Sequence, residues 1–152
     1  MTAIYNCETE MSLRVILILN VARSPLSSEM IALIDFLSVY GKEFGLYEYN
    51  LNGDSPFMYS QMSVRHSSVS KALQNLGLKE LIEFVPSRTK GYTYKINEDG
   101  IDFCNALEST YAFEYDKCAR RAYEYVKKHG ARNVQQEIDD KEKNTQWRDA
   151  DD

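Results

Sequence analysis

The residues best suited to chemistry are few, and they are scattered along the chain. His66 and His129 are the only histidines, and neither lies at metal-ligand spacing from a cysteine. The sequence has no C-x-x-C pair, and Gly41-Lys42 lacks the earlier glycine of a phosphate-binding loop. It also has no nucleophile elbow. We therefore expect no enzymatic activity, no cofactor and no metal, although carboxylates distant in sequence can still converge in space.

A second kind of chemistry is the recognition of nucleic acid. Residues 61–97 carry six basic and two acidic side chains, a net charge of +4, in a chain whose net charge is −5. A basic helix and hairpin are typical of a surface that contacts phosphates. A solvated basic face explains the same pattern, and +4 is a weak field. The candidate DNA contacts in this segment are Arg65, Ser68, Lys71, Gln74, Arg88 and Lys90.

Aromatic side chains suggest a third function, the binding of a protein partner. The chain has eleven tyrosines, and two segments carry more apolar and aromatic groups than a small core can cover. Such side chains are enriched at protein–protein interfaces. Packing of either segment on its own domain is the alternative. The candidate partner-binding residues are Tyr47, Tyr49, Phe57, Tyr59, Tyr111, Phe113, Tyr115 and Tyr125.

The basic segment has the pattern of a helix followed by a hairpin. Apolar residues at helical spacing over 69–76 predict a helix with Ser67 or Ser68 as its N-cap. Short strands follow over 81–85 and 92–96, joined by a turn. This order is typical of the second half of a winged helix-turn-helix, where the helix can enter the major groove and the hairpin is the wing.

Two further helices are predicted before this unit. Residues 9–22 are apolar nearly all round, which favours a buried helix over a buried strand. Ser27 as N-cap and Glu29 in the first turn begin the second helix, which ends near Gly41. The predicted fold class is therefore α+β, mostly helical: a winged helix-turn-helix.

Two additions to a minimal winged helix are expected. Residues 44–62 form an insertion before the third helix that is too apolar for a solvated linker. A long C-terminal helix is predicted from Asn97 or Asp99 to about His129, with Gly130 as its stop. The highly charged residues 131–152 are expected to be a disordered acidic tail. The predicted organisation is thus a winged-helix domain with its helical extension over 1–130, followed by this tail.

Cysteine usage indicates the compartment. Cys104 and Cys118 are fourteen residues apart on the predicted C-terminal helix, about 21 Å at 1.5 Å per residue, which is too far for a disulfide. Free, reduced thiols predict a cytoplasmic protein. The apolar run Val15–Leu19 is too short to span a bilayer, so no membrane association is expected.

Several short motifs between residues 8 and 125 occur in a recognisable order. They are Leu13-Arg14-Val15-Ile16-Leu17, Leu33-Ile34-Asp35-Phe36, Asn50-Leu51-Asn52-Gly53-Asp54, Arg65, Gly91-Tyr92, Gly100 and Ser109-Thr110-Tyr111-Ala112. This order resembles the small middle component of ABC-three-component systems, the group that includes the small subunit of Lamassu-type bacterial anti-phage systems. The segment from Arg65 to Gly100 also resembles MarR- and PadR-like transcription regulators.

The first resemblance implies a non-catalytic winged-helix adaptor subunit that links an SMC- or Rad50-like coiled-coil ATPase to an effector, often a nuclease. The second implies a dimeric DNA-binding transcriptional regulator. Net acidity, the insertion and the additional helix favour the adaptor. We therefore expect an ATPase and a nuclease effector as partners, with at most weak contact between this chain and duplex DNA.

Overall fold

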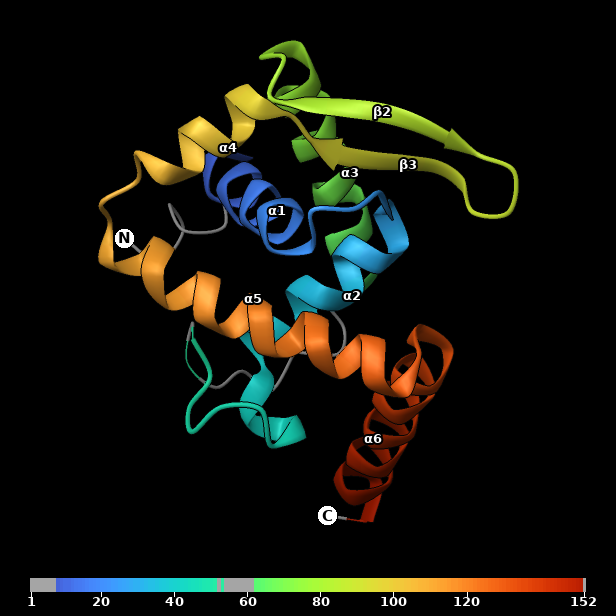
Figure 1. Ribbon diagram of the computed structural model, residues 1–152. Coiled ribbons are helices and arrows are strands. Elements are labelled where there is room, and N and C mark those ends of the chain that lie inside the picture. Colours follow the sequence, from blue (N-terminus) through green and yellow to red (C-terminus); the bar gives the residue numbers. More distant parts are fainter. Residues whose placement is uncertain (1–7, 52, 54–61, 152) are drawn as a thin grey trace.

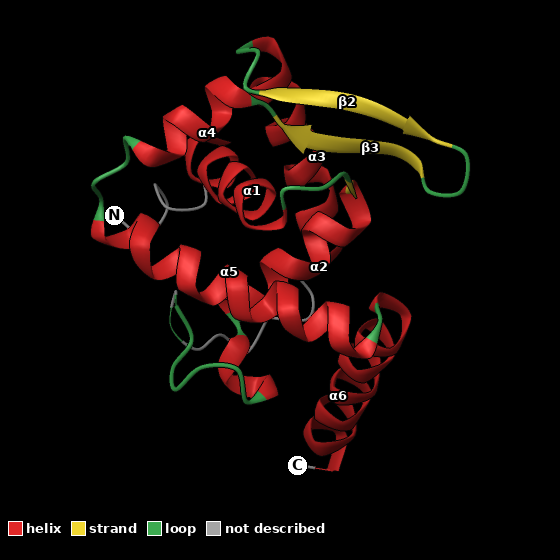
Figure 2. Ribbon diagram, viewed as in Figure 1, coloured by secondary structure: helices red, strands yellow, loops and turns green. Residues whose placement is uncertain are grey.

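The computed structural model describes residues 8–51, 53 and 62–151. These residues form six α-helices and a small three-stranded antiparallel sheet, so the fold is α+β and mostly helical (Figure 1 and Figure 2). The hairpin of the sheet projects beyond the helices. In chain order the elements are α1 (Glu8–Ala22), β1 (Leu26–Ser27), α2 (Ser28–Val39), the 3-10 helix η2 (Gly41–Phe44), α3 (Met62–Leu78), β2 (Ile82–Ser87), β3 (Gly91–Ile96), α4 (Glu98–Asn105), α5 (Thr110–His129) and α6 (Ala131–Asp151).

Helix α1 lies among the other helices because it is apolar on nearly every side. Val15, Ile16 and Leu19 have no exposed surface. Helices α2, α3, α4 and α5 all contact α1. An element buried on several faces needs apolar residues on all of them, which is why its sequence shows little amphipathic periodicity. The prediction of a helix rather than a strand for residues 9–22 is confirmed.

Helix α2 begins where its capping residues predict. The Ser27 hydroxyl accepts a hydrogen bond from the Met30 backbone N–H at 3.2 Å, and Glu29 lies in the first turn. Residues 31–40 are all buried. The helix is held between α3 and α5, so it buries much more than the single apolar face that its spacing predicts.

The predicted hairpin is confirmed, although its turn is shorter than expected. Strand β3 is central, with β1 on one side and β2 on the other, and Phe84 pairs with Tyr94. Strand β2 continues through Pro86 and Ser87, which the sequence pattern assigned to the turn. Proline is tolerated there because β2 is an edge strand, where a missing N–H costs the sheet little.

Helix α3 begins at Met62, before the predicted cap at Ser67 or Ser68, so that cap assignment is wrong. The buried stripe of α3 continues one turn toward the N-terminus through Arg65, which lies four residues before Val69. Ser67 and Ser68 therefore lie inside the helix, because packing of this buried stripe outweighs their weak preference for capping positions.

The predicted C-terminal helix is divided in two, which corrects the expectation of one continuous helix. Asn97 caps α4 as predicted, its side chain accepting from the Gly100 N–H at 2.8 Å. The chain then bends, and Ser109 caps α5 by accepting from the Ala112 N–H at 2.9 Å. This second cap lets α5 change direction and cross both α1 and α2. Gly130 ends α5, as predicted, at a positive φ of 87°.

The segments expected to be loop or tail also differ in part from their predictions. Residues 131–151 form α6, and Val134 and Ile138 on this helix are buried, whereas the sequence suggests a disordered tail. Two apolar residues four positions apart suffice to place one side of the first turns of α6 against α5 and α2.

In the insertion, η2 and residues 46–51 are described, while Phe57 and Tyr59 lie outside the described residues.

One glycine marks a very close approach of backbone segments. Gly100 lies in the first turn of α4 and is buried against the start of the hairpin. A Cβ at this position would collide with the Leu81 carbonyl oxygen and lie 2.6 Å from Cγ1 of Ile96. Any larger residue would therefore push α4 away from the sheet.

Candidate functional site

The main polar feature of the core is an ionic cluster around Asp35, which we call the Asp35 cluster: Arg14, Asp35, Arg65 and Tyr115. The Arg14 guanidinium faces the carboxylate with Nε 3.0 Å from Oδ1 and donates from Nη2 to Oδ2 at 3.0 Å. Arg65 Nη1 donates to Oδ2 at 2.9 Å, and the Tyr115 hydroxyl donates to Oδ1 at 2.5 Å. One carboxylate therefore links α1, α2, α3 and α5.

All four side chains of the Asp35 cluster are buried. Asp35 and Tyr115 have no exposed surface, and Arg14 and Arg65 are only 2 % and 7 % exposed. The Arg65 guanidinium also lies over the Phe36 ring, 5.5 Å from its centroid. The cluster is closed to ligands in this structure, and its contacts hold the helices together.

The electrostatic environment keeps Asp35 ionised. Burial by itself would raise the pKa of Asp35, but the charges of Arg14 and Arg65 and the Tyr115 hydroxyl outweigh it and lower that pKa below its ordinary value. Burial and the neighbouring Asp35 charge raise the pKa of Tyr115 well above its ordinary value, so this hydroxyl remains a donor.

The lowered pKa of Asp35 predicts that stability is lost in acid. The ionised carboxylate contributes its full stabilisation above its unfolded-state pKa of about 4. Below about pH 4 the unfolded chain binds a proton more readily than the folded chain, so this stabilisation decreases with falling pH. We expect the difference in free energy of unfolding between wild type and Asp35→Asn to shrink from pH 5 to pH 3 in urea titrations. A difference that stays constant to pH 3 would contradict this assignment.

The sequence analysis did not identify this cluster, although a signal was present. Arg14 lies between Leu13 and Val15, and Asp35 lies between Ile34 and Phe36, so each charge falls inside an apolar run where it must find a partner. Two such charges of opposite sign predict a buried pair. The third and fourth members, Arg65 and Tyr115, carry no comparable signal because their own segments are amphipathic.

The candidate DNA contacts are not all exposed. Arg65 is buried in the Asp35 cluster, so the prediction that it meets phosphate is wrong for this structure. Ser68 is partly buried on α3. The remaining four are exposed: Lys71 and Gln74 on α3, and Arg88 and Lys90 in the hairpin turn. The exposed basic surface therefore lacks Arg65.

Aromatic side chains dominate one face of the hairpin. Phe84 and Tyr92 are 55 % and 67 % exposed, and their ring centroids lie 4.8 Å apart. Tyr94, opposite Phe84, completes the contact with its centroid 5.6 Å away. A groove of about 540 Å³ between this face and α3 is lined by Leu73, Gln74 and Phe84, among others. We call Phe84, Tyr92 and Tyr94 the hairpin aromatic face; the sequence analysis did not single it out.

The described part of the insertion packs on α5. Tyr47 and Tyr49 both donate to Glu114 Oε2, at 2.9 and 3.0 Å. These hydrogen bonds raise the pKa of Tyr47 and lower that of Glu114. Arg121 lies over the Tyr47 ring, 4.9 Å from its centroid. Tyr47 is partly buried, while Tyr49 remains 49 % exposed.

The candidate partner residues of α5 are separated by the packing of this helix. Tyr115 has no exposed surface, which removes it from any partner-binding surface. Tyr111 is partly buried and stacks on Tyr115 at 6.2 Å. Tyr125 is partly buried and donates to Glu137 Oε2 on α6 at 2.6 Å. Phe113 is 58 % exposed, so it alone among these α5 residues presents most of its ring to solvent.

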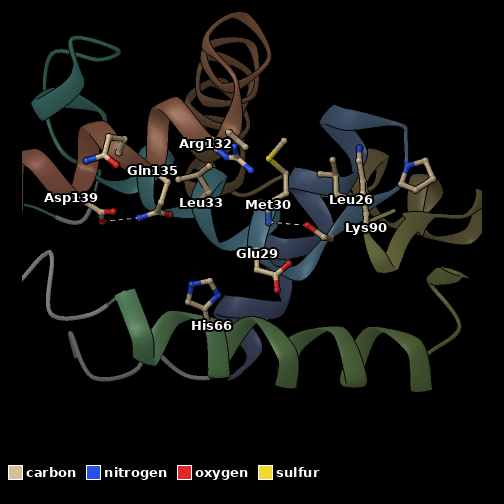
Figure 3. Close-up of a pocket in the computed structure, with 13 residues that line it drawn as sticks. Leu26, Glu29, Met30, Leu33, His66, Lys90, Arg132, Gln135 and Asp139 are labelled. Atoms are coloured by element: carbon tan, nitrogen blue, oxygen red, sulfur yellow. Dashed lines mark hydrogen bonds between the residues drawn. The ribbon is translucent and has the colours of Figure 1, made fainter. Parts of the chain in front are cut away.

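A wide hollow lies between the start of α2, α3 and α6 (Figure 3). Its volume is about 810 Å³. Glu29 and His66 line it from α2 and α3, and Arg132 and Asp139 from α6. Gln135 already donates to Asp139 Oδ1 at 3.1 Å. Charges of both signs are mixed along its rim, which gives no preference for an anionic or a cationic ligand.

The two thiols in the described part of the chain, Cys104 and Cys118, are poorly suited to catalysis. Cys104 and Cys118 are free, and burial raises the pKa of each to about 11. Both are therefore protonated and weakly nucleophilic at neutral pH.

Within the described residues, no group of three His, Cys, Asp or Glu side chains is placed to bind a metal ion. No helix in that part of the chain is both long and apolar enough to cross a membrane.

Comparison with known proteins identifies one family. The sequence matches the family described as ABC-three component (ABC-3C) system Middle Component 2 over residues 4–148. No curated protein and no solved structure matches the chain significantly. The match spans nearly all of the sequence, including most of α6. The chain therefore belongs to the Middle Component 2 family of ABC-three-component systems, whose members work in multi-protein complexes.

Proposed function

We propose that this chain is a non-catalytic winged-helix adaptor in a Lamassu-type bacterial anti-phage complex. In this role it links an SMC- or Rad50-like coiled-coil ATPase to a nuclease effector. Membership of the Middle Component 2 family supports a role within a multi-protein system. The protonated thiols of Cys104 and Cys118 and the closed Asp35 cluster support a structural rather than a catalytic part.

The winged-helix part of the proposal rests on the order of elements. Helix α1, strand β1, helices α2 and α3 and the β2–β3 hairpin follow one another, and the sheet order is β1-β3-β2. In a winged helix the third helix can enter a groove of DNA, and the hairpin is the wing. Here α3 takes the position of that third helix.

The hairpin aromatic face is the observation that carries the adaptor role. Phe84, Tyr92 and Tyr94 share one side of a hairpin that projects beyond the helices. Aromatic residues are enriched at the centres of protein interfaces. A wing specialised for phosphate would instead present cations along this side. We therefore assign the groove between α3 and the hairpin to a protein partner.

Other surfaces extend this interface or support weaker binding. Phe113 and the half-exposed Tyr49 supply additional partner contacts on the side of α5 and the insertion. Lys71, Arg88 and Lys90 remain available for weak, salt-sensitive contact with duplex DNA inside the complex, whereas Gln74 lines the groove assigned to the partner. This arrangement favours the adaptor over a dimeric transcriptional regulator of the MarR or PadR type, which needs a stronger basic face.

The test is co-purification with the proteins encoded by neighbouring genes. Phe84→Ala and Tyr92→Ala should each weaken binding of the ATPase subunit roughly thirtyfold, the equivalent of about 2 kcal/mol for a buried aromatic anchor. Glu83→Ala is the matched control, because residue 83 lies on the same strand but points to the opposite face. The purified chain alone should show neither nuclease nor ATPase activity.

Charge-reversal variants separate the two candidate functions. Lys71→Glu with Lys90→Glu should abolish residual DNA binding and leave the protein complex intact, because both side chains are exposed cations. Loss of the protein complex in this double variant, together with full co-purification of Phe84→Ala, would contradict the proposal. A salt-resistant, sequence-specific DNA complex would instead favour the regulator.

A further inference from the structure

The outer side of strand β2 has no partner strand among the described residues, because the sheet order is β1-β3-β2. Pro86 shows which backbone groups of β2 face outward. It is paired with Tyr92 but has no N–H, so these two residues cannot exchange hydrogen bonds. They form a non-hydrogen-bonded pair, and such pairs alternate with hydrogen-bonded ones along an antiparallel ladder. Phe84, two residues before Pro86, therefore also directs its N–H and C=O away from β3.

Two hydrogen bonds on either side of Phe84 agree with this assignment. The Val85 carbonyl oxygen faces β3, where it accepts from the Thr93 hydroxyl at 2.6 Å. The Leu81 carbonyl oxygen, just before β2, accepts from the Asn97 N–H at 3.2 Å. Odd-numbered residues thus face β3, and the even-numbered ones between them face outward. Phe84 is 55 % exposed, so its outward N–H and carbonyl oxygen are open to a partner.

This open edge runs beside the groove between α3 and the hairpin. Ile82, Phe84 and Tyr94 line the groove from the hairpin, and Leu73 and Gln74 line it from α3. A strand that pairs with β2 would place the side chain opposite Phe84 on this same face of the sheet. Alternate side chains of that strand would therefore enter the groove, where Leu73, Ile82 and Phe84 offer apolar contacts.

The backbone groups of the edge decide which occupant fits. A helix satisfies its own backbone, so a docked helix would remove water from the Phe84 N–H and carbonyl without replacing its hydrogen bonds. A second copy of this chain fits no better. Two-fold pairing of two β2 strands around Phe84 would set Pro86 of each copy opposite Ile82 of the other, and each proline lacks the donor that this pair requires. An extended segment of a different protein has neither limitation.

We propose that β2 accepts an extended segment of a partner protein as a further strand of the sheet, with apolar side chains of that segment in the groove against α3. The Phe84 N–H donates to a backbone carbonyl of the segment, and the carbonyl oxygens of Phe84 and Pro86 accept from its N–H groups. The missing N–H of Pro86 limits the pairing toward the hairpin turn. This inference rests on the proposed adaptor function and specifies how the partner binds at the same groove.

The backbone contact can be tested by replacing Phe84 with phenyllactate, which keeps the ring but has an ester oxygen in place of the N–H. The ladder between β2 and β3 does not use this N–H, so the hairpin should stay folded. Binding to the proteins encoded by neighbouring genes should weaken about tenfold, because a carbonyl of the partner loses its donor inside the interface. The same replacement at Phe103, on α4 and outside the groove, is the matched control and should leave binding unchanged.

Amide hydrogen exchange of the unmodified chain gives an independent readout. In the free chain the Phe84 N–H should exchange much faster than the Val85 N–H, which is bonded within the hairpin. In the complex the exchange of the Phe84 N–H should slow by about tenfold or more. Protection of this N–H in the free chain would show that the edge is already covered. Protection that rises with the concentration of the chain would identify a second copy as the occupant. Either result would overturn the proposal.

The adaptor function and this inference fail in different ways. If Phe84→Ala weakens the complex but the phenyllactate variant binds like wild type, the partner uses side chains alone. The adaptor function then stands and strand addition is wrong. An unprotected Phe84 N–H in an intact complex has the same meaning. If the wild-type chain forms no complex with these proteins, the adaptor function itself is contradicted, and this inference with it.

Discussion

Replacing Asp35 with alanine is expected to lower the free energy of unfolding by about 3–5 kcal/mol, the largest effect we predict. The change leaves the guanidinium groups of Arg14 and Arg65 buried without a carboxylate, and it removes the acceptor of the Tyr115 hydroxyl. Such a loss is a large part of the total stability of a domain, typically 5–15 kcal/mol. Urea unfolding followed by circular dichroism would measure it.

Two comparisons isolate the cause of this destabilisation. Asp116→Ala removes a partly exposed surface carboxylate that Arg120, itself exposed, contacts at 2.8 Å, and it should cost less than about 1 kcal/mol. A triple variant, Arg14→Met, Asp35→Leu and Arg65→Met, replaces the charges with apolar groups and should recover most of the stability lost in Asp35→Ala. Equal effects of Asp35→Ala and Asp116→Ala would show that the Asp35 cluster is unimportant.

Gly100→Ala should destabilise the fold by about 1–3 kcal/mol, the range found for overpacked cores. The added methyl group would meet the Leu81 carbonyl oxygen, a backbone atom that cannot move without shifting the hairpin. Helix propensity alone would predict the opposite change in the free energy of unfolding, because alanine is a better helix former than glycine by about 1 kcal/mol. Close packing of α4 on the hairpin therefore outweighs helix propensity at this position.

Gly77→Ala provides the matched control for Gly100→Ala. Gly77 also lies in a helix, α3, but it is exposed and a Cβ there would meet nothing within 4 Å. Its replacement should raise the free energy of unfolding by roughly 0.5–1 kcal/mol. Thermal and urea unfolding of the two variants should thus shift in opposite directions. A stabilised Gly100→Ala would disprove the close approach of α4 to the hairpin.

The elements with strong local signals could be predicted from the sequence. Ser27 and Asn97 cap the helices that follow them, and Gly130 ends α5. The hairpin also followed from its alternation of side chains. Each of these signals acts within a few residues, so no knowledge of the tertiary structure is needed to interpret it.

The features that depend on distant partners could not be predicted in the same way. Arg65 has the composition of a DNA contact on a basic helix, yet Asp35, thirty residues earlier, holds it in the core. Tyr115 has the sequence context of a surface aromatic, yet its hydroxyl donates to the same carboxylate and its side chain lies in the core. The hairpin aromatic face was missed for the opposite reason. Alternating apolar residues predict that this side of the sheet is buried, but α3 covers only the end of the hairpin near Ile82 and Ile96 and leaves Phe84 and Tyr92 exposed.

The Asp35 cluster also sets an order of events during synthesis of the chain. Tyr115 follows Asp35 by eighty residues, which at a translation rate of about 5–20 residues per second corresponds to roughly 4–16 s. During that interval the nascent chain has Arg14 and Asp35, and Arg65 joins them thirty residues after Asp35, but α5, the helix that covers α1 and α2, is still missing. The apolar surfaces of those helices are then open to chaperones. A chain released before α5 is made would therefore leave these apolar surfaces exposed, and we expect it not to fold stably.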